Sequence, residues 1–283
     1  MKQNKEAMSL KSRIVQIAKK NNVAAQAVMQ NFLFERFLAR LSKTEFKDKF
    51  VVKGGMLIAS IVGIGTRSTM DLDATLRNMP LTETAIMDAV QNICAVEIDD
   101  DVTFSNFTFE PIRKDDAYGG YRLKMKATYF TISNPLSIDI STGDAITPEP
   151  IEYAFPSLFD DSENIKIWGY NVETILAEKL ETIISRGVAN TRPRDFYDVY
   201  ILQKKKRTNV NKLRAALDAT AKHRGTDNIL DSAKSVLKDI RTSSFLIDLW
   251  EKYRKQYPYA NNLDFETVTK SVEALIARVN PGS

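Results

Sequence analysis

The pattern of apolar residues changes near residue 170, and this change sets the fold class. Before it, residues 102–112, 121–132 and 135–142 are rich in Phe, Tyr, Thr and Ile, and turn residues such as Ser133-Asn134-Pro135 separate them, which predicts β-strands. After it, apolar residues recur every three to four positions, which predicts helices. The sequence therefore predicts an α+β protein with an α/β domain over residues 1–165 and a helical domain over residues 166–283.

Local signals give approximate bounds for the elements. In the first domain they predict helices at 9–21, capped by Ser9, and at 24–46, then a short buried strand, FVVK, and a helix, MLIASIVGI. A further helix is expected at 82–96. In the second domain Asn171 and Gly187 bound one helix and Pro193 begins the next. The remaining helices are expected near 211–223, 227–241, 243–256 and 265–279.

Composition excludes several classes of protein. No apolar run reaches the roughly 18 residues that span a bilayer, and the polar start MKQNKEAMSLK is not a signal peptide, so we expect a cytoplasmic protein without a membrane partner. The chain has one cysteine, Cys94, and one histidine, His223, which excludes an internal disulfide and a Cys- or His-rich metal site. Any metal would be bound by carboxylates, which favours Mg²⁺ or Mn²⁺.

Three aspartates are candidate metal ligands. In DLDATL the apolar residues alternate with Asp71 and Asp73, so a strand would place both carboxylates on one face. In SIDIS the same alternation places Asp139 opposite its isoleucines. If the two strands are neighbours, three carboxylates converge, as a two-metal phosphoryl-transfer site requires. The ordinary alternative is that these aspartates lie at strand ends or turns, exposed to water.

Residues on either side of the apolar run 56–64 could bind phosphate. Gly54 and Gly55 lack a Cβ, so their backbone N–H groups can approach a phosphate closely, although a glycine pair is also typical of an ordinary turn. Arg67, Ser68 and Thr69 directly precede the aspartates and could donate hydrogen bonds to phosphate oxygens.

Two clusters in the helical domain carry further candidates. Lys179 projects from the apolar side of its predicted helix, where it needs a partner such as a triphosphate, unless it extends to the surface, and Arg186 lies near the end of that helix. Asp195 and Asp198 are one helical turn apart, and the alternative to a functional role is an intrahelical ion pair of Arg194 with Asp198.

Positive charge is concentrated in residues 204–224, called the basic segment below. It contains eight basic residues and one acidic residue, Asp218. Such a segment suits a polyphosphate backbone, but taken alone it favours the ordinary interpretation, a solvated helix face and its loop. The basic residues are Lys204, Lys205, Lys206, Arg207, Lys212, Arg214, Lys222 and Arg224.

Five motifs occur in order: K-G-G, R-S-T-x-D-L-D, I-D-I, E-K-L-E-x-x-x-x-R and R-x-R-D-x-Y-D. With LFERFLARLSKTEFKDKFVVKGGML, they resemble the AbiEii/AbiGii-type toxins, bacterial nucleotidyltransferases of the polymerase-β-like superfamily that act in toxin–antitoxin phage defence. The resemblance covers residues 25–205, to within a few residues. It implies a polymerase-β-like nucleotidyltransferase domain with a mixed sheet, followed by a helical domain that contributes Lys179 and Asp195 to the site.

The resemblance also implies a role for each candidate residue. Asp71 and Asp73 would be the primary ligands of Mg²⁺ or Mn²⁺, and Asp139 the third carboxylate. Lys179 would bind the triphosphate, and Asp195 matches the aspartate of the last motif. The residues implied around the phosphates are Gly54, Gly55, Arg67 and either Ser68 or Thr69, and those implied in support are Arg186, Arg194 and Asp198.

Members of the resembled family transfer a nucleotide from an NTP to an RNA acceptor, characteristically a tRNA 3′ end, and this blocks translation. We therefore expect a monomeric toxin with an NTP substrate, an RNA acceptor and a cognate antitoxin encoded nearby. A small-molecule nucleotidyltransferase and a catalytically idle nucleotide- or RNA-binding module are the alternatives. The carboxylate trio with Lys179 argues against the idle module, and the basic segment favours RNA. The preferred NTP, the RNA and any direct contact with the antitoxin are left open by the sequence.

Overall fold

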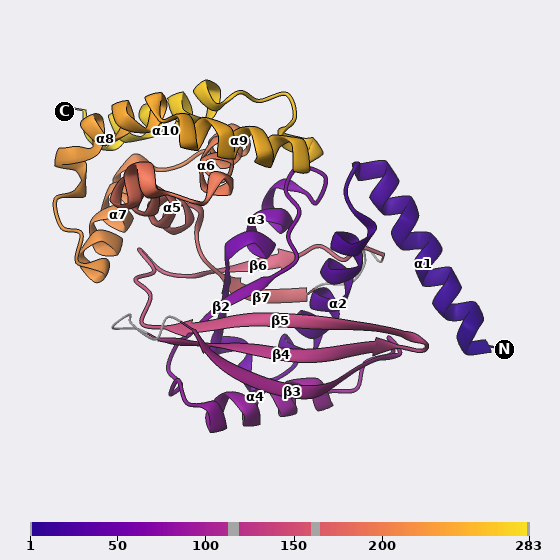
Figure 1. Ribbon diagram of the computed structural model, residues 1–283. Helices are drawn as coiled ribbons and strands as arrows, with labels where there is room; N and C mark the ends of the chain where they lie inside the picture. The colour runs from indigo at the N-terminus through magenta and orange to yellow at the C-terminus, as the bar shows by residue number, and fades with distance from the viewer. Residues whose placement is uncertain (1, 113–118, 160–164, 282–283) are drawn as a thin grey trace. The chain divides into compact units, whose positions relative to one another are not determined.

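A computed structural model describes residues 2–112, 119–159 and 165–281 (Figure 1). The chain divides into two compact units. Unit 1 comprises Met1–Gly143 and Ile151–Gly169, and unit 2 comprises Asp144–Pro150 and Tyr170–Ser283. The expected division at residue 165 differs from these bounds, because residues 144–150 belong with the helices and residues 165–169 belong with the sheet.

Unit 1 is built around one mixed sheet. Its strands are β1 (Phe50–Lys53), β2 (Leu72–Leu76), β3 (Val102–Ile112), β4 (Gly120–Tyr129), β5 (Ile132–Thr142), β6 (Ile151–Phe155) and β7 (Ile165–Gly169). Among the described residues the sheet has seven strands in the order β3-β4-β5-β2-β1-β7-β6. Strand β2 is parallel to β5 and β1 is parallel to β7, whereas the other neighbours are antiparallel. The expected α+β class and mixed sheet are confirmed, but β6 and β7 were not anticipated.

The turn between β4 and β5 was predicted at the wrong place. The chain reverses at Phe130 and Thr131, since Tyr129 pairs with Ile132, and Pro135 continues within β5. A proline is tolerated there because the paired part of β2 begins only opposite Ile138, so this stretch of β5 has a neighbour on one side alone.

Four helices of unit 1 accompany the sheet: α1 (Lys2–Asn21), α2 (Ala25–Leu41), α3 (Gly54–Val62) and α4 (Glu83–Ala95). Helices α2 and α4 pack against each other and against β5 and β3, and α3 packs against β1 and β2 (Figure 1). The prediction that Ser9 caps the first helix is wrong. The buried positions Ala7, Leu10 and Ile14 keep the helical spacing upstream of Ser9, so the helix extends back to Lys2.

Unit 2 contains the predicted helices. They are α5 (Val172–Arg186), α6 (Pro193–Lys205), α7 (Val210–Arg224), α8 (Ile229–Thr242), α9 (Ser244–Gln256) and α10 (Phe265–Val279). Asn171 accepts a hydrogen bond from the Thr174 N–H and Gly187 ends α5, as expected. Aromatic side chains form much of the core around Trp250, whose indole N–H donates to the Leu263 carbonyl at 3.0 Å. No helix in the described part of the chain has both the length and the apolar character of a membrane span.

The segment 144–150 is attached to the start of α5 by hydrogen bonds. The Thr147 N–H donates to Thr174 Oγ1 at 3.1 Å, and Thr174 Oγ1 donates to the Thr147 carbonyl at 2.9 Å. Asn171 Nδ2 donates to the Thr147 and Glu149 carbonyls at 3.0 and 2.8 Å. These bonds explain why the segment belongs to unit 2 although strands of unit 1 precede and follow it.

Candidate active site

The junction of β1 and α3 places two glycines at the start of a helix. Gly54 has a φ of 67°, in the left-handed region that glycine adopts without strain. A Cβ on Gly54 would lie 2.0 Å from Asp73 Oδ2, and a Cβ on Gly55 would lie 2.7 Å from Thr69 Oγ1. The first N–H groups of a helix have no acceptor within it, so this turn can donate to an anionic oxygen. The Asp73 carboxylate therefore lies directly against a potential phosphate-binding turn.

The segment before β2 is held in place by α2. Asn31 Nδ2 donates to the Thr69 carbonyl at 3.2 Å and to the Ala27 carbonyl at 2.9 Å. Arg67, Ser68 and Thr69 are all buried, and the Arg67 guanidinium donates to the Ser68 carbonyl. Arg67 Nη2 lies 3.4 Å from the position of a Cβ on Gly55. Thr69 rather than Ser68 is thus the hydroxyl in contact with Gly55.

Charged residues lie in register on five neighbouring strands at this level of the sheet, and the fifth, Glu110 of β3, is opposite Arg122. Lys53 of β1 pairs in register with Asp73 of β2, Asp73 with Asp139 of β5, and Asp139 with Arg122 of β4. We call these four residues the charged row. Residues directly opposite each other in a sheet project from the same face. Asp71, directly before β2, lies near enough for its charge to help raise the pKa of Arg122. The expected neighbourhood of the DLDATL and SIDIS strands is therefore present.

Arg122 was not anticipated from the sequence. Its Nε and Nη2 donate to the two carboxylate oxygens of Asp139 at 2.7 and 2.8 Å. These hydrogen bonds and the charge of Asp139, with smaller contributions from Asp71 and Glu110, raise the pKa of Arg122 above its ordinary value. At the other end of the row, buried Lys53 donates to Ser141 Oγ at 2.8 Å. In the sequence, Arg122 is recognisable only as a basic residue in the predicted strand that precedes SIDIS.

In unit 2, Lys179 forms a cluster with two buried aspartates. Lys179 Nζ lies 2.6 Å from Asp195 Oδ1 and 3.3 Å from Asp198 Oδ2. The Lys179 side chain is 18% exposed and those of Asp195 and Asp198 are 2% and 0% exposed. We call these three residues the Lys179 cluster. Lys179 was expected to need a partner, and in this structure α6 supplies it.

The arginines assigned a supporting role lie outside this cluster. Arg194 is exposed and does not pair with Asp198, so the intrahelical pair considered for this segment is not formed. Asp198 is turned instead toward Lys179, because it lies on the buried side of α6 where α5 packs. Arg186 is exposed in the last turn of α5.

The basic segment divides into two parts. Arg214 pairs with Asp218 at 3.0 Å, and Arg224 pairs with Glu178 at 3.1 Å and with Glu181. These two arginines therefore serve contacts within unit 2. Residues 204–207, at the end of α6, are exposed and form a run of four consecutive positive charges, and Lys212 and Lys222 are exposed on α7.

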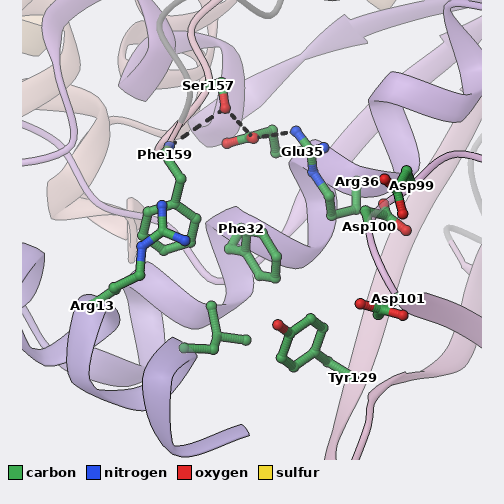
Figure 2. Close-up of a pocket in the computed structure, with 11 residues that line it drawn as sticks. Arg13, Phe32, Glu35, Arg36, Asp99, Asp100, Asp101, Tyr129, Ser157 and Phe159 are labelled. Atoms are coloured by element: carbon green, nitrogen blue, oxygen red, sulfur yellow. Dashed lines mark hydrogen bonds and ion pairs between the residues drawn. The ribbon is translucent and has the colours of Figure 1, made fainter. Parts of the chain in front are cut away.

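Unit 1 also contains a pocket of about 300 Å³ (Figure 2), whose lining includes no residue of the charged row. Its buried Glu35 accepts hydrogen bonds from Ser157 Oγ at 2.7 Å and from the Leu158 N–H at 2.8 Å. Burial raises the pKa of Glu35. Beside it, the Arg13 guanidinium stacks 3.9 Å from the centroid of Phe159. These contacts tie α1 and α2 to residues 157–159, which gives the pocket walls a structural role.

Comparison with known proteins identifies the family. The model of the nucleotidyl transferase AbiEii toxin of Type IV toxin–antitoxin systems matches residues 36–277. The chain belongs to this family. Membership confirms the resemblance found in the motifs, and it implies an NTP substrate and an antitoxin partner for this AbiEii protein. A search of curated proteins found no match.

Two solved structures share the AbiEii fold seen here. The crystal structure of JHP933 from Helicobacter pylori has a TM-score of 0.51 and 16% sequence identity, over 91% of this chain and 95% of that chain. The crystal structure of a putative nucleotidyltransferase from H. pylori has a TM-score of 0.51 and 16% identity, over 92% of this chain and 99% of that chain. At this identity the comparison supports the fold alone.

The carboxylates of this AbiEii protein fit a divalent metal in part. Asp73 on β2 and Asp71 directly before that strand offer oxygen ligands, and such ligands suit Mg²⁺ or Mn²⁺. Within residues 2–112, 119–159 and 165–281, however, no group of three or more His, Cys, Asp or Glu side chains is arranged to hold a metal. The Asp139 carboxylate lies in register with Asp73 but binds Arg122 with both oxygens.

Gly54→Ala is expected to destabilise the protein and to reduce nucleotide transfer at least tenfold. The left-handed φ costs an alanine about 1 kcal/mol or more, and the new Cβ would displace the Asp73 carboxylate. Thermal unfolding and transfer rates measure the two effects. Gly225→Ala is the matched control, because Gly225 has a φ of 66° but no atom within 4 Å of its Cβ position. Equal transfer by the two variants would contradict a role for the contact between Gly54 and Asp73.

Proposed function

We propose that this AbiEii-family protein transfers a nucleotide from an NTP to an RNA acceptor, the 3′ end of a tRNA, and thereby blocks translation. The observation that carries the proposal is the packing of the Asp73 carboxylate against the glycine start of α3. A metal-binding carboxylate and a phosphate-binding helix start side by side are what nucleotidyl transfer requires. The choice of a tRNA rests on the family resemblance, and the exposed charge of residues 204–207 favours RNA over a small molecule.

The candidate residues of unit 1 have distinct roles in the proposed reaction. Asp71 and Asp73 would hold Mg²⁺ or Mn²⁺, which would supply positive charge to offset that of the phosphates. The N–H groups of Gly54 and Gly55 and the Thr69 hydroxyl bind phosphate oxygens, and the guanidinium of Arg67 adds positive charge behind them. These groups are fixed before substrate arrives, because the segment 67–69 is buried and held by Asn31. Binding therefore requires little rearrangement of the phosphate contacts.

The chemistry is a substitution at the α-phosphorus of the NTP. A hydroxyl oxygen of the acceptor forms a bond to that phosphorus, the bond to the bridging oxygen of the β-phosphate breaks, and pyrophosphate leaves. The hydroxyl proton passes to solvent. The protein contributes position and charge rather than a covalent intermediate.

Lys179 is assigned to the triphosphate by the family motif. Its ammonium group is held by Asp195 and Asp198, which restrict the side chain to one orientation. The Lys179 side chain as a whole is 18% exposed. Asp195 and Asp198 thus act as positioning residues in the proposal.

The proposal is tested with labelled nucleotides. The protein is incubated with Mg²⁺, total cellular RNA, a metabolite extract and each α-³²P-labelled NTP in turn. We expect one NTP to label RNA of tRNA size, and Asp73→Asn to abolish the label. Label on a small molecule instead would identify a small-molecule nucleotidyltransferase. No transfer of label with any NTP, in Mg²⁺ or Mn²⁺, would contradict an enzyme and favour a binding module.

Neutralising residues 204–207 is expected to weaken tRNA binding and to leave NTP binding unchanged. Each lost phosphate contact lowers the slope of log affinity against log salt by about 0.7–0.9. Fluorescence anisotropy with labelled tRNA, measured from low to high salt, gives the affinity for tRNA and the slope of its salt dependence. An unchanged slope would show that these residues form only a solvated helix end. The control neutralises an equal number of exposed lysines on α8 and α9: Lys234, Lys238, Lys252 and Lys255.

A further inference from the structure

Arg122 and Asp139 form an ion pair between the neighbouring strands β4 and β5. They are directly opposite each other in the antiparallel pairing of β4 and β5, and two parallel hydrogen bonds of 2.7 and 2.8 Å join them. This fork-to-carboxylate geometry uses both oxygens of Asp139. The side chains are 44% and 25% exposed, so the pair is accessible to solvent and to ions.

The Arg122–Asp139 ion pair determines which carboxylates of the charged row are available to bind a metal. Asp73 and Asp139 are neighbours in register, and two carboxylates at this spacing repel each other unless positive charge offsets them. Lys53 and Arg122 flank them in the same row. The row contains two acids between two bases, and Glu110, which is opposite Arg122 on β3, pairs with Lys124. Asp139 is at the same time withheld from Asp71 and Asp73.

We propose that Arg122 is an internal counter-ion that competes with the divalent metal for Asp139. The inference rests on the proposed function, in which Asp71 and Asp73 bind that metal. In the metal-free protein Arg122 neutralises Asp139, and metal binding displaces the guanidinium so that Asp139 becomes the third ligand. A partly exposed ion pair contributes little to stability, so a divalent ion can break it.

Two consequences follow from this exchange. Arg122 lowers the affinity of the site for metal alone, because binding includes the cost of breaking the pair. It also keeps the carboxylates of the metal-free sheet from repelling one another. The released guanidinium presents a planar pair of donors on the metal-binding face, a geometry that matches a phosphate group.

The test measures Mn²⁺ binding to the nucleotide-free protein, by the electron paramagnetic resonance signal of the free ion. Arg122→Gln is expected to bind Mn²⁺ up to about fivefold more tightly than the wild type, since breaking an exposed ion pair costs up to about 1 kcal/mol. Arg122→Lys keeps the charge but loses the paired hydrogen bonds, so its affinity should lie between the two. If Arg122→Gln does not fold, the affinity of Arg122→Lys relative to the wild type provides the test.

Lys124→Gln is the matched control. Lys124 is two residues from Arg122 on the same face of β4, is 46% exposed and pairs with Glu110 instead of a row carboxylate. Its loss should leave Mn²⁺ affinity unchanged. Adding Asp139→Asn to Arg122→Gln should abolish the gain, because Asp139 is then no longer a ligand.

The outcomes separate this inference from the proposed function. If Asp73→Asn does not weaken Mn²⁺ binding, the metal site itself is wrong. If Asp73→Asn weakens it but Arg122→Gln binds no more tightly than Lys124→Gln, the metal site stands and the counter-ion role is overturned. A gain that survives the addition of Asp139→Asn would likewise overturn the exchange at Asp139.

Discussion

Asp73→Asn is expected to reduce nucleotide transfer by about 1,000-fold or more, because a carboxylate that holds the metal cannot be replaced by a neutral amide. Asp71→Ala should have the same effect. Toxicity in the host should be lost together with transfer. The fold should persist, because Asp73→Asn keeps the size of the side chain and Lys53 keeps its hydrogen bond to Ser141. Label incorporation from the α-labelled NTP and growth after induction measure the two losses.

The control for this experiment is Asp88→Asn, which makes the same chemical change at an exposed position on α4. It should retain wild-type transfer and toxicity. Circular dichroism should show that all the variants are folded. If Asp73→Asn and Asp71→Ala retain near-normal transfer, the assignment of these carboxylates to the reaction is wrong.

Lys179→Ala is expected to lose both NTP use and stability. The substitution leaves Asp195 and Asp198 buried without the ammonium group between them, and breaking a buried pair in this way costs about 3 kcal/mol. NTP binding by calorimetry should fall, whereas tRNA binding by the folded fraction should be nearly unchanged. Denaturant unfolding measures the stability loss.

A triple variant separates the two effects of Lys179. Combining Lys179→Ala with Asp195→Asn and Asp198→Asn removes the unpaired charge, so most of the stability should return. Transfer should not return, because no ammonium group is available for the triphosphate. Recovery of transfer together with stability would show that Lys179 is only a structural ion pair.

The positions of the candidate residues in the N-terminal motifs, on their strands and at the helix start, could be predicted because they depend on local rules. Alternation around Asp73 predicts its face of the strand, and the glycines predict a close backbone approach at the start of α3. The spacing in SIDIS predicts the face of Asp139 in the same way. The structure brings these residues together in one register across β1, β2 and β5.

Arg122 could not be predicted, because its position opposite Asp139 depends on where the chain turns. The turn at Phe130 and Thr131 has a φ of 48° at Phe130, a conformation for which Gly or Asn is the usual signal. Ser133-Asn134-Pro135 is the stronger turn signal in the sequence, so the predicted turn lies several residues after the observed one. An error in the turn shifts every cross-strand pair of the hairpin, so the partner of Asp139 could not be identified.

The partner of Asp198 illustrates a second limit. Spacing along a helix places Asp195 and Asp198 on one side, but it does not decide between a partner on the same helix and one on a packed neighbour. The choice of Lys179 over Arg194 follows from the packing of α5 against α6, which only the folded core determines.

The chain passes between the two units three times, after Gly143, after Pro150 and after Gly169. No single cut therefore yields two complete fragments. A fragment that stops at residue 165 lacks most of β7 and leaves one edge of β1 without its parallel neighbour, and an unpaired strand edge promotes aggregation. The complementary fragment lacks the Thr147 contacts at the start of α5. Expressing the two units as separate proteins would therefore require new connections between the chain segments of each unit, because no truncation leaves both units complete.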